Sequence, residues 1–335
     1  MERVLRDYKA TGDCNRAPGW DYFRMSYPIG LLRSAAVLAV VVASLGAHPD
    51  HNATQQTDVV LVPATEPPPG ASKVSITIEG DQRVIVANGL PDHTTGRFPN
   101  ADNPNGITAQ SYRFTVPAVP MANAQPTALQ MQPFGIAING VLFDPGTAEF
   151  WHNDPDSGWH YDAKGDAFSL GLDANNAHVQ PNGGYHYHGV PIALLARLTA
   201  GQPAMTLLGW AADGFPIYGL WGYRTAGDTG SGLVALKSSY RLKPGSRPTA
   251  NGQPGGTYDG SFVEDFEYVA GSGDLDACNG RVGVTPEFPA GTFYYVLTTD
   301  FPFVPRFFRG APDKSFLRRG GPGGRRGPPP PRPPA

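Results

Sequence analysis

Cysteine is nearly missing from this chain, whose 335 residues include only Cys14 and Cys278. Cys14 lies in an N-terminal segment that we expect to be removed, and one remaining thiol cannot form an internal disulfide. The sequence therefore excludes a small scaffold held together by disulfides. Cys278 reads most simply as a small buried residue.

Charged residues are also scarce, at 16% of the chain, and they are unevenly placed. Residues 1–47 and 306–335 together hold 14 of the 26 basic residues but only 5 of the 29 acidic ones, which leaves 12 basic and 24 acidic residues in 48–305. An acidic body disfavours nucleic acid as a partner, because binding to phosphates needs a basic face. A G-x-S-x-G elbow is also missing, which counts against a nucleophilic hydrolase.

No uninterrupted apolar run in the sequence has the length of a membrane-spanning helix. The longest, Ser34–Ala47, is too short to cross a bilayer of about 30 Å. Its small-residue ending and its basic flank, Arg24 and Arg33, are typical of a signal peptide cleaved between residues 43 and 47. We therefore expect a secreted or periplasmic protein with no stable membrane span after cleavage, and an uncleaved N-terminal anchor is the alternative.

Composition divides the chain into four segments. We expect an N-terminal extension and signal peptide over 1–47, a linker over 48–72, one β domain over 73–310, and a disordered tail rich in Gly, Pro and Arg over 311–335. Residues 1–24 are unlike any leader, so translation starts at either Met1 or Met25.

The body has the composition of a β protein. Its 42 Gly and 35 Pro suit many short strands joined by turns, and 17 Phe, 14 Tyr and 5 Trp provide a packed core. Lys73–Ala87 reads as a hairpin, Phe134–Phe143 as two strands around Asn139-Gly140, and Ile192–Leu198 as a helix. These patterns predict a mainly β domain, an antiparallel sandwich or barrel-like fold with long loops and one or two short helices.

The segment HVQPNGGYHYHG, residues 178–189, carries the chemistry. His186 and His188 are two residues apart, so in a strand both imidazoles lie on one face. Pro181-Asn182-Gly183 suits a three-residue turn with glycine in the left-handed conformation. That turn pairs His178 with His186 and brings a third imidazole to the same face, whereas a two-residue turn would point His178 away.

Three clustered imidazoles suit a metal site, because two or more protonated rings would repel one another. Neutral nitrogen ligands favour zinc or copper over calcium and magnesium. A structural polar cluster and metal-free acid–base catalysis are the alternatives. A calcium site elsewhere in the acidic body also stays open.

The chain resembles the YHYH-domain family, secreted proteins named for the tetrapeptide found here at Tyr185–His188. The resemblance covers most of residues 85–310. It rests on the following segments in one order: NGLPDH (88–93), HVQPNGGYHYHG (178–189), ADGFPIYG (212–219), LDACNGR (275–281) and TPEFPAGTFYYVLTTDFPF (285–303). The resemblance implies an exported protein but no activity. Where some relatives carry a further His-rich stretch, this sequence has Phe293-Tyr294-Tyr295.

Two further residues in these segments are candidates for the site. His93, in a long loop, is a candidate fourth metal ligand. Asp213, in a turn flanked by glycine, is a candidate ligand, a carboxylate that orients a histidine, or a general base. An Asp in this position can equally be a turn former.

These observations predict a secreted metal-binding protein with ligands His178, His186 and His188. An enzyme that hydrolyses or oxidises would follow if one coordination position is open to water. The partner is expected to be a small molecule or a component of the cell envelope. The alternative is a glycan-binding module whose exposed tryptophans stack on sugars while the histidines are structural.

Overall fold

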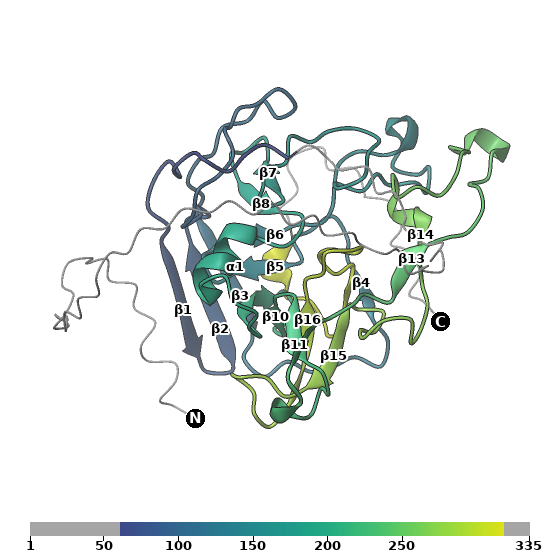
Figure 1. The fold of residues 1–335 in the computed structure, drawn as a ribbon. Helices are drawn as coiled ribbons and strands as arrows, with labels where there is room; N and C mark the ends of the chain where they lie inside the picture. Colours follow the sequence, from purple (N-terminus) through teal and green to yellow (C-terminus); the bar gives the residue numbers. More distant parts are fainter. Residues whose placement is uncertain (1–60, 318–335) are drawn as a thin grey trace, which may run out of the picture. The chain divides into compact units, whose positions relative to one another are not determined.

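Short β-strands joined by turns and long loops form residues 61–317, the part of the chain that the computed structural model describes (Figure 1). These residues lie within one compact unit, Gln56–Ala335, and the other unit, Met1–Gln55, falls outside the described part together with the predicted signal peptide. No helix within residues 61–317 is long and apolar enough to cross a membrane. The prediction of a mainly β fold is confirmed.

A three-stranded antiparallel sheet opens the unit. β1 (Val74–Glu79) and β2 (Gln82–Ala87) form the predicted hairpin, and β3 (Tyr112–Pro117) pairs with the other edge of β2. Gly80, in the turn, has a φ of 65°, which glycine adopts without steric cost. The central strand β2 is mostly buried, whereas the edge strand β1 is mostly exposed.

The second sheet has eight strands in the order β15-β16-β10-β9-β5-β6-β8-β7. Two of its pairings, β6 with β8 and β10 with β16, are parallel, so the sheet is mixed rather than wholly antiparallel. Residues 61–317 form no closed barrel. The strands are β5 (Gly135–Ala137), β6 (Leu142–Phe143), β7 (Ala177–Val179), β8 (Tyr185–Tyr187), β9 (Leu207–Ala211), β10 (Pro216–Tyr218), β15 (Gly280–Gly283) and β16 (Thr292–Val296).

The one α-helix of the described part, α1 (Ile192–Thr199), follows β8 directly. Pro191 precedes its first turn, and its apolar residues recur on one side, with Leu194 fully buried. The helix ends at Ala200, which has a left-handed φ of 50°. The predicted helix is therefore confirmed.

The remaining elements are two-stranded ladders and single turns of 3₁₀-helix. The ladders pair β11 with β12, β13 with β14, and β4 with β17. Their bounds are β4 (Thr127–Ala128), β11 (Trp221–Tyr223), β12 (Leu233–Ala235), β13 (Tyr240–Leu242), β14 (Phe266–Tyr268) and β17 (Phe307–Phe308). The 3₁₀ turns are Trp151–Asn153, Thr229–Ser231, Ala250–Gly252, Val263–Asp265 and Lys314–Phe316.

The domain boundaries differ from those that composition suggested. The backbone N–H of Val62 donates to the carbonyl of Leu172 at 2.8 Å, so the end of the predicted linker is already part of the packed unit. Phe316 is buried and stacks on Phe114 with ring centroids 4.2 Å apart, so the first residues of the predicted tail also pack. Apolar side chains near both ends account for this, because their burial compensates for ordering the backbone.

Candidate metal centre

A three-residue turn sets the register of the hairpin formed by β7 and β8. Gly183 has a φ of 85°, and its N–H donates to the carbonyl of Gln180 at 2.8 Å. The N–H of Gln180 in turn donates to the carbonyl of Gly184 at 3.0 Å. His178 therefore stands directly opposite His186, and the predicted register is confirmed.

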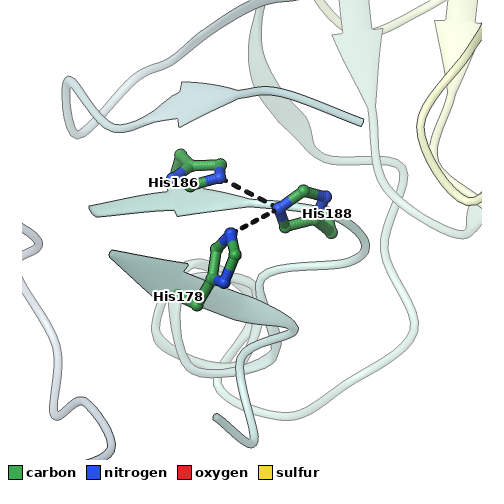
Figure 2. Close-up of side chains that lie close together, drawn as sticks. All are labelled: His178, His186 and His188. Carbon is green, nitrogen blue, oxygen red and sulfur yellow. Dashed lines mark hydrogen bonds between the residues drawn. The ribbon is translucent and has the colours of Figure 1, made fainter. Parts of the chain in front are cut away.

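Three imidazole rings meet on one face of this hairpin (Figure 2). Nε2 of His188 lies 3.0 Å from Nε2 of His178 and 2.9 Å from Nε2 of His186. Each ring offers one ligand nitrogen, and these nitrogens all lie within 4.8 Å of one another. His186 and His188 are buried, and His178 is half-buried. Within residues 61–317, this is the cluster whose side chains are close enough to share a metal ion.

Hydrogen bonds at the outer edge of two rings fix which nitrogens face inward. Nδ1 of His178 lies 3.0 Å from the carbonyl oxygen of Leu170, and Nδ1 of His186 lies 3.2 Å from that of Gly184. A carbonyl oxygen only accepts, so each Nδ1 carries the hydrogen and each neutral ring presents a bare Nε2 lone pair. Nε2 of His188 has at most one hydrogen, which it cannot donate to the lone pairs of both His178 and His186. A cation would instead accept all three lone pairs.

The loop before the hairpin supports His178 from outside. Nδ2 of Asn103 donates to the carbonyl of Val179 at 3.0 Å, and Nδ2 of Asn105 donates to the same carbonyl at 2.9 Å. The Asn103 amide also lies 3.2 Å from Nδ1 of His178, at the edge that faces Leu170. The long asparagine-rich loop therefore holds His178 and its strand in place.

Burial keeps the imidazoles of His178 and His188 in the neutral form, which is the form that can bind metal. It lowers the pKa of His178 to about 3, and the nearby His186 lowers that pKa further. Burial also lowers the pKa of His188 well below its usual value, with further lowering by His186 and His178. Nδ1 of His188 is buried without a hydrogen-bond partner, although the nearby Pro145 carbonyl acts to raise the pKa of this ring.

Two of the three nitrogen spacings are close to those of a tetrahedral metal site. Ligand nitrogens about 2.0–2.1 Å from a zinc ion at tetrahedral angles lie about 3.4 Å apart. The contacts of 2.9 and 3.0 Å at His188 are slightly shorter than this, and the third spacing, between His178 and His186, is within 4.8 Å. The three nitrogen donors fit zinc or copper better than calcium or magnesium.

The opposite face of β8 carries the two tyrosines of the motif, and it also contains His93. The hydroxyl of Tyr185 donates to Oδ2 of Asp173 at 2.7 Å. The hydroxyl of Tyr187 accepts from Nδ2 of Asn139 at 2.9 Å and lies 2.7 Å from Nε2 of His93. The structure therefore does not bring His93 to the three histidines, and its role is to satisfy a buried tyrosine.

Asp213 likewise lies outside the histidine cluster. Its carboxylate accepts from the hydroxyl of Tyr295, from the backbone N–H of Gly310 at 2.8 Å and from that of Phe215 at 3.3 Å. Burial raises the pKa of Asp213 to about 6, and these hydrogen bonds oppose the rise. Asp213 thus closes the turn between β9 and β10 and anchors the C-terminal segment. This is the turn-forming role that the sequence left open beside a role in the site.

A buried carboxylate that the sequence did not single out acts on His178 through its charge. Asp144 follows β6, is 1% exposed, and donates its backbone N–H to the carbonyl of Tyr187 at 2.9 Å. The sequence shows only an aspartate after an apolar pair, which is common at strand ends. The parallel pairing of β6 with β8 gives Asp144 its position, and no local pattern encodes that pairing.

Comparison with known proteins gives one family and no individual relative. Neither the curated proteins nor the solved structures contain a match to this chain. The family model described as YHYH protein matches residues 113–310, more than half of the chain, and this range includes the whole histidine hairpin. The chain therefore belongs to the YHYH protein family.

Proposed function

We propose that this is an exported metal-binding protein in which His178, His186 and His188 hold one zinc or copper ion. The observation that carries the proposal is the convergence of three imidazole nitrogens, with contacts of 2.9 and 3.0 Å at His188. The outward Nδ1 atoms of two of these rings are occupied by carbonyl groups, so their inward lone pairs are available to a cation.

The two metal-free alternatives account for fewer of these contacts. A purely structural cluster would leave two lone pairs facing one N–H, and burial removes the water that would otherwise satisfy them. A general base works best with a pKa near the working pH. Burial lowers the pKa of His178 to about 3, too far from neutrality for that role.

The glycan-binding alternative depended on exposed tryptophans, and the structure does not favour it. Trp159 and Trp210 are buried, and Trp151 and Trp221 are half-buried. The guanidinium of Arg83 covers the ring of Trp210, with its Cζ 3.4 Å from the centroid. None of these four tryptophans is exposed.

Export rests on the N-terminal sequence. The apolar run Ser34–Ala47 with its basic flank supports secretion or transport to the periplasm. Mass spectrometry of the mature protein expressed from its own start should give an N-terminus just after residues 43–47. A mature protein that retains the whole apolar run would support a membrane anchor instead.

Elemental analysis tests metal binding directly. Protein purified after growth with zinc and copper should contain about one of these ions per chain, and His186→Ala should lose it. His93→Ala is the matched control, because His93 is a buried loop histidine that contacts Tyr187 on the opposite face of β8, and this variant should keep the ion. A folded wild-type protein that takes up neither metal, even after incubation with excess zinc or copper, would contradict the proposal.

A further inference from the structure

The three-stranded sheet has one covered edge and one open edge. At the β3 edge, the backbone N–H of Thr115 donates to Oγ of Ser315 at 3.1 Å, and this hydroxyl donates to the carbonyl of Thr115 at 3.2 Å. The segment that contains Ser315 therefore covers β3. At the opposite edge, β1 pairs with β2 alone among residues 61–317 (Figure 1). The six residues of β1 thus present an open strand.

Every second residue of β1 directs its backbone groups away from β2. The N–H of Asn88 donates to the carbonyl of Lys73 at 3.0 Å, so Lys73 belongs to a hydrogen-bonded pair with the neighbouring strand. In an antiparallel ladder such pairs alternate with pairs that exchange no hydrogen bond. The register of β1 with β2 is unbroken, so the N–H and C=O groups that point outward are those of Val74, Ile76 and Ile78. These groups have no hydrogen-bond partner in the described part of the chain.

The side chains of these three residues form an apolar stripe. They stand opposite buried residues of β2, so they lie on the core face of the sheet, yet Ile76 is 37% exposed and Ile78 is 44% exposed. Edge strands are commonly protected by an inward-pointing charge, a proline or a bulge, and β1 has none of these. An open apolar edge of this kind is a place where another strand can extend the sheet.

The sequence of β1 and of the residue before it is complementary to itself in one antiparallel register. Placing Ile76 opposite Ile76 of a second copy gives the following further pairs: Val74 with Ile78, Ser75 with Thr77, and Lys73 with Glu79. Apolar side chains then meet apolar ones, hydroxyls meet hydroxyls, and each charge meets its opposite. Glu79 also lies 3.8 Å from Arg113 of its own chain, but both side chains are more than half exposed, so this contact leaves the carboxylate accessible to a second cation.

The same register satisfies the outward backbone groups. Ile76 faces Ile76 and Val74 faces Ile78, so all three residues with outward N–H and C=O groups enter hydrogen-bonded pairs. A shift of one residue would place outward groups against inward ones. A shift of two residues would leave one of the three outward residues beyond the end of the partner strand and would separate Lys73 from Glu79.

We propose that two copies of this chain associate through β1, antiparallel about a two-fold axis at Ile76, so that two three-stranded sheets join into one sheet of six strands. The occupant of the edge is a second copy because the strand complements itself in charge, in side-chain type and in backbone hydrogen bonding. The contact is limited to Lys73–Glu79 of each chain, so the dimer is a small one that dissociates on dilution. It does not depend on metal binding.

The molecular mass of the mature protein in solution is the first test. Analytical ultracentrifugation over a concentration series should show a mass that rises from one chain toward two. Ile76→Lys places two like charges on the two-fold axis and should remain a single chain throughout. Val282→Lys is the matched control, because Val282 is an apolar residue, 71% exposed, on the edge strand β15 of the other sheet, and this variant should dimerise like the wild type. A wild-type protein that stays a single chain at every concentration, or an Ile76→Lys variant that dimerises equally well, would overturn the proposal.

Charge reversal tests the register with variants at exposed positions, where the fold is not at risk. Lys73→Glu or Glu79→Lys alone sets like charges opposite each other at both ends of the contact and should raise the dimer Kd about tenfold. The double variant, Lys73→Glu with Glu79→Lys, restores opposite charges and should return the Kd close to the wild-type value. A double variant that dimerises as weakly as the single ones, or single variants that dimerise like the wild type, would rule out this pairing and the proposal with it.

Discussion

The turn before the YHYH segment gives the sharpest test of how this site is built. Gly183 has a φ of 85°, and a Cβ placed on it would lie 1.9 Å from Oγ1 and 2.9 Å from Cβ of Thr108. Gly183→Ala therefore adds two costs. The left-handed conformation costs an ordinary residue about 1–2 kcal/mol. Forcing a methyl group into occupied space costs about 1–3 kcal/mol more.

We expect Gly183→Ala to lower the free energy of unfolding by about 2–5 kcal/mol. It should also weaken zinc binding, because a shifted turn changes the pairing of His178 with His186. Urea unfolding with a chelator measures the first effect. Unfolding with excess zinc measures the second, since an ion at about 1,000 times its Kd adds about 4 kcal/mol to the wild type.

Gly80→Ala separates the two costs. Gly80 also occupies a hairpin turn with a positive φ, of 65°, but a Cβ there would meet nothing within 4 Å. This variant should lose only the conformational part, about 1–2 kcal/mol, and should bind zinc like the wild type. The reasoning is refuted if Gly183→Ala is no less stable than Gly80→Ala, or if it retains full zinc affinity.

Three further outcomes are expected. The metal-free protein should lose up to about 5 kcal/mol of stability as the pH falls from about 6.5 to about 3. The reason is that burial lowers the folded-state pKa of His178 to about 3, so the unfolded chain binds more protons than the folded one in this range. Urea unfolding midpoints measured across the range check this, and His178→Gln should show a shallower loss. Asp213→Ala should cost about 2–4 kcal/mol by leaving the buried Tyr295 hydroxyl without its acceptor, while calorimetry shows unchanged zinc affinity. Arg306→Met should cost about 3–5 kcal/mol in thermal unfolding because the Asp162 carboxylate stays buried without its partner, and equal stability of the two proteins would contradict this.

The register of the histidine hairpin was predictable because the turn that sets it is local. Three residues, Pro181, Asn182 and Gly183, specify the turn, and the turn length alone decides whether His178 points toward His186. Strand alternation then assigns the remaining side chains to one face or the other. Register and the identity of the three clustered rings both follow within eleven residues.

The surroundings of the cluster were not predictable, because contacts distant in sequence determine them. Asp144 comes next to β8 through the parallel pairing of β6 with β8, and about forty residues separate these strands. The sequence made His93 a candidate metal ligand, yet its side chain bonds Tyr187 on the face of β8 opposite the three histidines. The path of a long loop depends on the sum of many side-chain contacts, which a single sequence does not reveal.

The tyrosine side of β8 has a consequence for engineering. The hydroxyl groups of Tyr185 and Tyr187 are hydrogen-bonded to Asp173 and Asn139, so these bonds hold β8 in place on the face opposite the histidines. The imidazoles on the other face take no part in these hydrogen bonds. Replacing His178, on the neighbouring strand β7, by cysteine should therefore shift the proposed metal site toward softer ions without loosening β8, so the preference of the hairpin for a metal can be changed one ligand at a time.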